Sequence, residues 1–230
     1  MKKRNQIILL ATGSLLVLFV LYTITIMYID VEPIGPQDSP VGLATLNSAW
    51  QHLVGVHMVL YHITDWLSLL PILVALGFAV LGLVQLIKRK SLFRVDNSIL
   101  LLGGFYLLVM GAYLFFEFNI VNYRPVLING ILEASYPSST TMLVMCVMVT
   151  AMMQLPRRIQ NKTVRITVNI LFGVFTLAMI IGRMISGVHW VSDILGSILL
   201  SSALIMLYYS VDQYIQSNQI HPSSDLKQSN

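Results

Sequence analysis

The sequence has few charged residues and almost no cysteine. Asp, Glu, Lys and Arg make up 10% of the 230 residues, whereas hydrophobic residues make up 56% and the mean hydropathy is +0.77. This number of charges is too small to cover the surface of an ordinary soluble domain. The composition therefore indicates a polytopic membrane protein. The single cysteine, Cys146, lies within an apolar run, which excludes a disulfide framework and a thiolate metal site within the chain.

The sequence also lacks internal repeats, low-complexity blocks and any sign of a second domain. Outer carboxylates and histidines show no spacing typical of metal ligands. We therefore expect a single domain over 1–230 with no metal and no other cofactor. The net charge is +4, but the basic residues are spread over the loops of one membrane face, so we expect no nucleic-acid partner. No obligate protein partner is evident.

Six long apolar runs dominate what is present. They cover 7–29, 64–87, 97–118, 138–155, 166–183 and 190–214. Each is long enough to cross about 30 Å of hydrocarbon, which takes about 20 helical residues. The runs are continuously apolar rather than alternating, which favours helices over a β-barrel. The first run is too long for a signal peptide and lacks a small-residue cleavage site, so we interpret it as a retained helix. The sequence thus predicts an all-α protein with six transmembrane helices.

The basic residues predict the orientation in the membrane. Six crossings place both termini on one side, and twelve of the fourteen Lys and Arg residues fall in the termini and connections of that side. By the positive-inside rule that side is cytoplasmic, in a multi-pass protein of the plasma or inner membrane. The two remaining basic residues, Arg124 and Arg183, lie on the outer side, where each needs a separate explanation.

Two local features modify this plan. In the first outer loop, apolar residues recur at helical spacing between Leu43 and Val54, which predicts a short helix lying in the outer interface. Pro71, near the start of the second span, is expected to kink that helix.

Three outer segments carry residues suited to catalysis. They are Asn122-Tyr123-Arg124-Pro125, Tyr136-Pro137-Ser138-Ser139-Thr140-Thr141, and the stretch from Gly182 to Asp193. The middle segment is typical of a helix start, where free N–H groups and the helix dipole favour an anion. Each segment alone has a plain structural explanation as a cap, a loop or an interfacial hydrogen bond. Their shared location on one membrane face favours function.

The third segment has the most specific pattern. His189 and Asp193 are four residues apart, so both side chains lie on one face if a helix begins near Trp190. The carboxylate can then hold the imidazole in one tautomer and leave its other nitrogen free to attack or to accept a proton. Arg183 can bind an oxyanion in front of that nitrogen. The grouping indicates phosphate chemistry.

These segments resemble the three-part signature of the type 2 phosphatidic acid phosphatase superfamily: K-x6-R-P, then P-S-G-H, then S-R-x5-H-x3-D. The third motif matches in spacing as Arg183-x5-His189-x3-Asp193, with Gly182 at the serine position. The first contributes Arg124-Pro125 and the second contributes Pro137-Ser138. The six-span layout matches as well, so the resemblance covers nearly the whole chain.

The resemblance implies a metal-independent lipid phosphatase whose site lies near the outer surface and opens sideways to the bilayer. His189 would form a phosphohistidine and Asp193 would orient it. The residues implied to hold the phosphoryl oxygens are Arg124, Arg183, Ser138 and Ser139. The implied substrates are amphiphiles with terminal phosphates, such as phosphatidylglycerophosphate, phosphatidic acid or undecaprenyl diphosphate. The alternative is a catalytically attenuated protein of the same fold that binds or transports lipid phosphates.

Two departures from the signature bear on the mechanism. Glu117 occupies the lysine position, where we expect it to pair with Arg124 or to cap the third span. Thr140 occupies the position of the histidine that protonates the leaving oxygen, and a threonine hydroxyl is too weak an acid for that role.

Three explanations of Thr140 stay open: another proton donor, a better leaving group, or an engineered substitution. Water, His57 or His62 are possible donors. A diphosphate expels a lipid monophosphate, which hardly needs a proton, so a native Thr140 with no other acid predicts a preference for diphosphates. Asp65, just inside the second span, is expected to cap its helix or to pair with His62.

Overall fold

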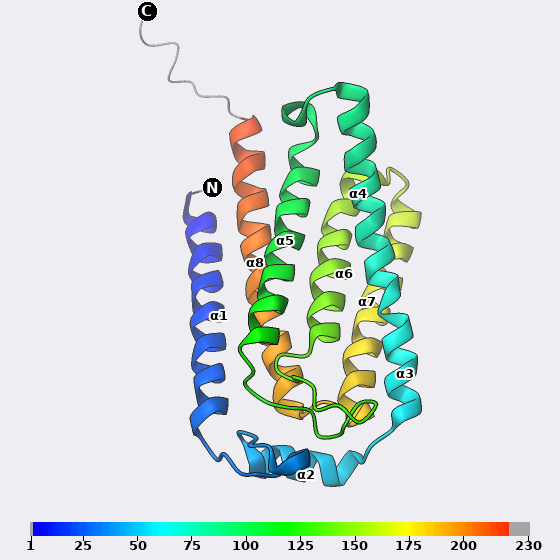
Figure 1. Cartoon of the computed structure of the whole chain (residues 1–230). Coiled ribbons are helices and arrows are strands. Elements are labelled where there is room, and N and C mark those ends of the chain that lie inside the picture. Colours follow the sequence, from blue (N-terminus) through cyan, green and yellow to red (C-terminus); the bar gives the residue numbers. More distant parts are fainter. Residues whose placement is uncertain (1, 221–230) are drawn as a thin grey trace, which may run out of the picture.

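The computed structural model describes residues 2–220 and forms an elongated bundle of helices (Figure 1). The helices are α1 (Lys2–Tyr28), α2 (Ala44–Val54), α3 (Met58–Leu67), α4 (Leu69–Arg89), α5 (Asn97–Phe118), α6 (Ser139–Arg158), α7 (Lys162–Ser186) and α8 (Val191–Ile220), with short 3-10 turns at Pro36–Asp38 and Leu92–Arg94. Within 2–220, β structure is restricted to isolated bridges. The prediction of an all-α fold is confirmed.

Six stretches are long and apolar enough to cross a membrane, as predicted. They are Gln6–Tyr28, Met58–Arg89, Asn97–Phe118, Ser139–Arg158, Lys162–Ser186 and Val191–Ser217. The second begins at Met58 rather than near residue 64, because α3 and α4 continue one another across a break at Ser68. Pro71 explains the break, since it has no N–H to bond the Leu67 carbonyl and its ring crowds that group.

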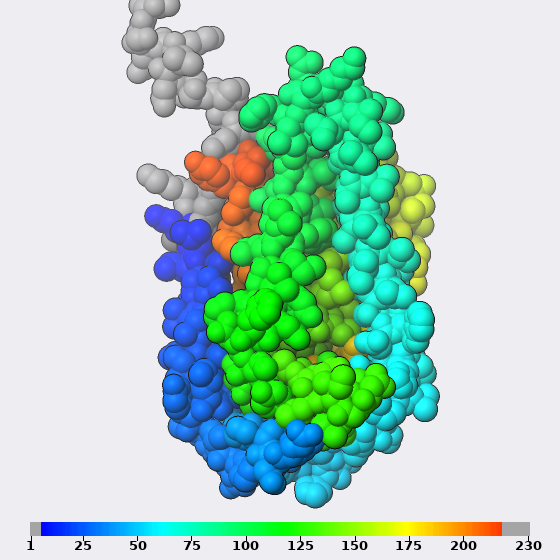
Figure 2. Space-filling model, in the orientation of Figure 1, coloured from blue at the N-terminus to red at the C-terminus, as the bar shows by residue number. Residues whose placement is uncertain are grey.

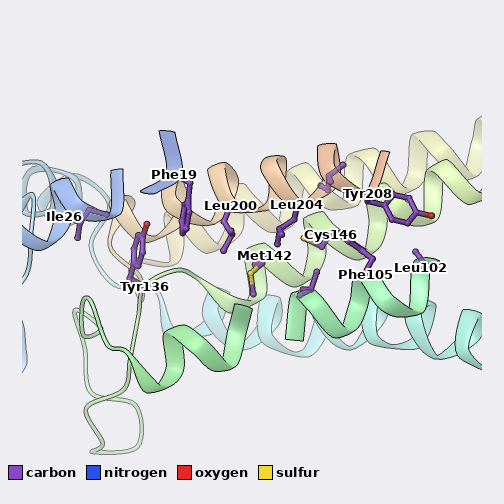
Figure 3. Close-up of a cluster of buried hydrophobic side chains, with 12 residues drawn as sticks. Phe19, Ile26, Leu102, Phe105, Tyr136, Met142, Cys146, Leu200, Leu204 and Tyr208 are labelled. Atoms are coloured by element: carbon purple, nitrogen blue, oxygen red, sulfur yellow. The ribbon is translucent and has the colours of Figure 1, made fainter. Parts of the chain in front are cut away.

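The centre of the bundle is built by α6 and α8. In their spans 61% and 50% of the residues are buried, against 11% in those of α1 and α7, whose apolar side chains face outward as lipid-facing residues do. A cluster of aromatic and aliphatic side chains from α1, α5, α6 and α8 fills the interior (Figure 3). The candidate site lies at one end of this core, beside the first turns of α6 and α8.

The two ends of the bundle differ. The start of α1, the end of α8 and the short α4–α5 and α6–α7 connections lie at one end (Figure 1). There Asp96 binds Arg158 and Arg89, and the hydrogen bond from Arg158 is the main cause that lowers the pKa of Asp96 to about 2. At the other end, α2 and the loop 119–138 cover the bundle (Figures 1 and 2).

The predicted short helix of the first outer loop is present as α2. Its Asn47 side chain donates to Ser192 Oγ at 2.9 Å and accepts from the Ser192 N–H at 3.2 Å. The Trp50 indole N–H donates to the Met184 carbonyl at 3.1 Å. These contacts hold α2 across the ends of α7 and α8, next to the turn that carries His189.

Candidate active site

A tight turn between α7 and α8 places His189. Gly187 ends α7 with a positive φ of 64°, and a Cβ at this position would lie 1.9 Å from the Gly55 carbonyl oxygen. Both the left-handed conformation and the close approach therefore require glycine. The Ser186 carbonyl accepts from the His57 N–H at 2.9 Å and fixes the turn against the start of α3. His189 is 2% exposed, so the turn directs the imidazole into the protein.

One nitrogen of His189 faces Ser135. Nδ1 lies 3.2 Å from the Ser135 carbonyl oxygen and 3.1 Å from its Oγ, and the Ser135 hydroxyl donates to Asp193 Oδ2. The distance from Nδ1 to Asp193 Oδ2 is 3.8 Å, too long for a direct hydrogen bond. The proton of the neutral ring therefore belongs on Nδ1, and Asp193 acts on His189 through the Ser135 hydroxyl.

Asp193 is completely buried and has several donors. Its carboxylate accepts from Asn122 Nδ2 at 3.3 Å and from the Trp190 N–H at 3.0 Å, besides the Ser135 hydroxyl. A buried carboxylate needs such donors, because an unpaired charge away from water is costly. Asn122 also accepts from the Gly42 N–H at 3.2 Å, so the same network joins the first outer loop to the site.

The other nitrogen of His189 faces Arg124. Arg124 Nη1 lies 3.1 Å from His189 Nε2, which accepts the hydrogen bond because the proton is on Nδ1. Arg124 is held by a narrow hairpin in the loop 119–138, with bridges between Tyr123 and Ala134 and between Ile128 and Ile131. The nitrogen expected to attack phosphorus is therefore neutral and lies beside a guanidinium.

Burial and two cations lower the pKa of His189 well below its ordinary value of 6.5. Burial has the largest effect, followed by the positive charges of Arg124 and Arg183, while the hydrogen bond to the Ser135 backbone acts in the opposite direction. The imidazole thus stays unprotonated at neutral pH and keeps a free lone pair on Nε2.

Arg183 lies at the end of α7 and is 2% exposed. Its Nη2 donates to Thr140 Oγ1 at 2.6 Å and to Asp65 Oδ1 at 2.9 Å. Its Nη1 and Nε are buried with no hydrogen-bond partner among the described residues. The Tyr61 ring lies against both arginines, 4.8 Å from the guanidinium carbon of Arg183 and 5.9 Å from that of Arg124. Arg183 therefore retains donors for an anion, although it is not among the residues that line the cavity beside His189.

A cavity of about 240 Å³ opens beside His189. Its lining includes Arg124, the residues Ser135 to Pro137, and Ser139 in the first turn of α6. Ser138 precedes this turn, and its Oγ is buried without a hydrogen-bond partner among the described residues. The free N–H groups of the turn, the helix dipole and the Arg124 guanidinium all favour an anion here.

Tyr136 fixes the segment between Ser135 and Ser138. Its ring stacks on Phe19 and packs so closely on Gly196 that a Cβ there would lie 2.3 Å from the ring (Figure 3). Its hydroxyl forms a hydrogen bond of 2.7 Å with Thr23 Oγ1. The bundle interior therefore sets the positions of the two serines.

Two expected pairings are wrong. Arg124 Nε pairs with Glu133 Oε2 at 3.0 Å rather than with Glu117, because the hairpin places Glu133 opposite Arg124. Glu117 lines the cavity and binds the Tyr113 hydroxyl. Asp65 pairs with Arg183 rather than with His62, since the packing of α3 on α7 brings the two together.

The histidines considered as proton donors lie apart from the cavity. His57 and His62 are exposed, and neither lines it. His57 Nε2 contacts the Val54 carbonyl at 2.8 Å, and His62 packs edge-on against Tyr61. Among residues 2–220, no three His, Cys, Asp or Glu side chains are grouped as metal ligands would be.

Sequence reasoning missed four residues of this site: Ser135, Asn122, Glu133 and Tyr61. Asn122 stands in a segment already singled out, and Ser135 directly precedes another, so proximity to these segments was an available signal. Glu133 had only its charge on the outer side as a signal. Tyr61 gave none, because its role depends on the packing of α3 against the end of α7.

Comparisons with known proteins support the family resemblance. The model of the PAP2 superfamily matches residues 106–217, a range that contains Arg124, Ser138, Arg183, His189 and Asp193. The predicted resemblance to the type 2 phosphatidic acid phosphatases is confirmed, and the match indicates a phosphatase, which hydrolyses phosphoric esters.

The fold is also similar to a solved structure. It is the crystal structure of a transmembrane PAP2 type phosphatidylglycerolphosphate phosphatase from Bacillus subtilis, with a TM-score of 0.57 and 20% sequence identity. The alignment covers 89% of this chain and 96% of that chain. No curated protein sequence matches the chain. The chain is a multi-pass membrane protein with the fold of that phosphatase.

Proposed function

We propose that this protein is a metal-independent lipid phosphatase in which His189 is the nucleophile. The observation that carries the proposal is the position of His189 Nε2, which is unprotonated, faces Arg124 and borders a cavity at the start of α6. Asp193 orients the ring through Ser135. This combination suits attack on phosphorus, because Arg124 and the N–H groups at the start of α6 favour an anion and the imidazole keeps a free lone pair.

The reaction has two steps. His189 Nε2 attacks phosphorus and the lipid oxygen leaves, which gives a phosphohistidine; water then releases inorganic phosphate. Arg124 turns its Nη1 from Nε2 to a phosphoryl oxygen when substrate enters, and Arg183, Ser138 and the N–H groups of α6 stabilise the charge that grows on the others. Fixed donors of this kind contribute several kcal/mol, about 2.7–4 for a single oxyanion donor in a well-studied case.

A second, apolar cavity supports an amphiphilic substrate. It measures about 530 Å³, lies between α4, α5 and α6, and shares Tyr113, Ser139 and Met142 with the cavity beside His189. Figure 2 shows α6 in the furrow between α4 and α5. A lipid chain in this furrow would present its terminal phosphate to His189. We propose phosphatidylglycerophosphate, phosphatidic acid or undecaprenyl diphosphate as the substrate class.

We propose that the site faces away from the cytoplasm in the plasma or inner membrane. The basic connections lie at the end of the bundle opposite the site, and basic connections remain on the cytoplasmic side. Labelling of single cysteines introduced beside Glu133 and beside Lys162, in intact cells, tests this orientation, after Cys146 has been replaced by alanine. The Glu133 position should react with an impermeant reagent and the Lys162 position should not.

Phosphate release from a panel of lipid monophosphates and diphosphates tests the function. The wild-type protein should release inorganic phosphate, and His189→Ala should abolish release. Release that persists in His189→Ala would exclude this mechanism. Tight binding without turnover would instead favour the alternative, an attenuated protein that binds or transports lipid phosphates. A strong preference for diphosphates would indicate that no acid protonates the leaving group.

A further inference from the structure

Thr140, which stands where the family signature has a histidine, does not supply an acid. Thr140 Oγ1 accepts a hydrogen bond from Arg183, and Thr140 lines the apolar cavity rather than the one beside His189. If the proposed function holds, an alkoxide leaving group still needs a proton, and a positioned acid contributes about 10²–10⁴-fold to such a step. A side chain that acts as this acid has to line the His189 cavity, where the leaving oxygen is released.

Two carboxyl groups line that cavity, those of Glu117 and Glu133. Glu133 lies in the hairpin that also carries Arg124, and the Glu133 carbonyl accepts from the Arg124 N–H at 3.1 Å. Its Oε2 is 3.0 Å from Arg124 Nε, while Nη1 of the same guanidinium is 3.1 Å from His189 Nε2. Arg124 thus lies between the Glu133 carboxyl group and His189, and the phosphate site is next to both.

Glu133 is better placed than the other outer carboxyl groups. Glu117 accepts a hydrogen bond from the Tyr113 hydroxyl on the wall formed by α5. Asp65 is bound to the buried Arg183 and does not line the cavity. The Glu133 side chain is 39% exposed, so it can exchange protons with water. When a phosphate takes the Arg124 Nη1 that now contacts His189, the Glu133 carboxyl group lies beside the bound phosphate, within reach of the leaving oxygen.

We propose that Glu133 is the general acid and base that replaces the missing histidine. In the first step the bond between His189 Nε2 and phosphorus forms, the bond between phosphorus and the lipid oxygen breaks, and the Glu133 carboxyl proton passes to that oxygen. In the second step water attacks phosphorus and gives a proton to the Glu133 carboxylate. The electrons of the bond between phosphorus and nitrogen return to Nε2, and Glu133 is protonated again.

Two esters with different leaving groups test this role. A short-chain phosphatidic acid expels an alkoxide, which needs a proton, whereas p-nitrophenyl phosphate expels a stable phenolate, which does not. Glu133→Gln should lower kcat/KM for the lipid by about 10²–10⁴-fold and leave kcat/KM for the aryl ester nearly unchanged, because kcat/KM reports only the steps up to loss of the leaving group. Glu133→Asp keeps a carboxyl group and should fall between the wild type and Glu133→Gln. Glu32→Gln, in the first outer loop, is the matched control and should change neither substrate.

Three outcomes would contradict the proposal. An equal loss of kcat/KM for both esters would mean that Glu133 only shapes the cavity. No loss for the lipid, or a Glu133→Asp variant no better than Glu133→Gln, would also overturn it. If Glu133→Gln does not fold, the comparison of Glu133→Asp with the wild type tests the proposal instead. Failure of the proposed function gives a different pattern: no phosphate release by the wild type, or release that survives His189→Ala.

Discussion

Arg124 Nη1 lies 3.1 Å from His189 Nε2, so a cation donates a hydrogen bond to the nitrogen that we propose as the nucleophile. This contact requires an unprotonated nitrogen and therefore fixes the tautomer. It also keeps the nucleophile occupied until an anion competes for the arginine. The same pair thus accounts for the protonation state of His189 and for the dependence of attack on phosphate binding.

The first prediction concerns pH. The protonated imidazole cannot attack, and burial with the nearby charges of Arg124 and Arg183 lowers the pKa of His189 below 6.5. Protonation of His189 should therefore reduce kcat/KM only below pH 6.5, which a profile of kcat/KM against pH measures. Arg124→Gln removes one of the two charges, so the residual activity should be lost at a higher pH.

Arg165→Gln is the control for this profile, because Arg165 lies at the far end of α7 and its substitution should not move the acid limb. An acid limb at or above pH 6.5 in the wild type, or one that stays in place in Arg124→Gln, would contradict the electrostatic argument.

The second prediction concerns Ser135, whose hydroxyl links His189 to Asp193. Ser135→Ala leaves the Asp193 carboxylate with fewer donors and His189 Nδ1 with only the backbone carbonyl. Loss of a hydrogen bond to a buried charged group costs about 1–3 kcal/mol, which predicts a fall in kcat of about 10–100-fold. Ser135→Thr retains the hydroxyl and should recover most of this loss. Equal rates for Ser135→Ala and the wild type would show that Asp193 does not act through this hydroxyl.

The third prediction concerns the turn before His189. Gly187→Ala strains a left-handed residue by about 1–2 kcal/mol and also pushes its Cβ into the Gly55 carbonyl, so stability and activity should both fall. Gly173→Ala is the matched control on the same helix, because a Cβ there meets nothing within 4 Å. That variant should be neutral or stabilised by up to about 1 kcal/mol. Thermal inactivation in detergent compares the two, and indistinguishable midpoints would contradict the prediction.

The fourth prediction concerns the ion pair between Arg183 and Asp65. Asp65→Ala leaves the buried guanidinium with Thr140 as its hydrogen-bond acceptor, but the Asp65 side chain is 54% exposed, so water replaces part of the interaction. We expect a modest loss of stability of about 1 kcal/mol, visible in the thermal midpoint. Glu32→Ala, an exposed change in the first outer loop, should leave the midpoint in place. A rise in the midpoint of Asp65→Ala would mean that the pair is unfavourable.

The sequence was sufficient for the spans and the motif segments because both depend on local patterns. Long apolar runs must become helices in lipid, and Arg124 and Arg183 were the basic residues that the positive-inside rule left unexplained. The contacts between segments could not be predicted in this way. Glu133 meets Arg124 only because a hairpin folds the loop back.

Trp190 illustrates the same limit. Its indole is typical of an aromatic belt at the membrane interface, which is how the sequence alone would place it. In the structure it is 3% exposed and donates to the Tyr123 carbonyl at 2.7 Å, because the turn at Gly187 directs it inward. The tertiary packing over the site determines where such side chains lie, and a single sequence gives little indication of that packing.

The most direct test of the account is to trap the intermediate. The purified protein is mixed with a short-chain phosphatidic acid, quenched in alkali to preserve a phosphohistidine, digested and examined by mass spectrometry. The account predicts one phosphoryl group on His189, absent from His189→Ala and lost on a chase without substrate. Phosphate release that proceeds with no phosphoryl group on His189, or with the group on another residue, would contradict it.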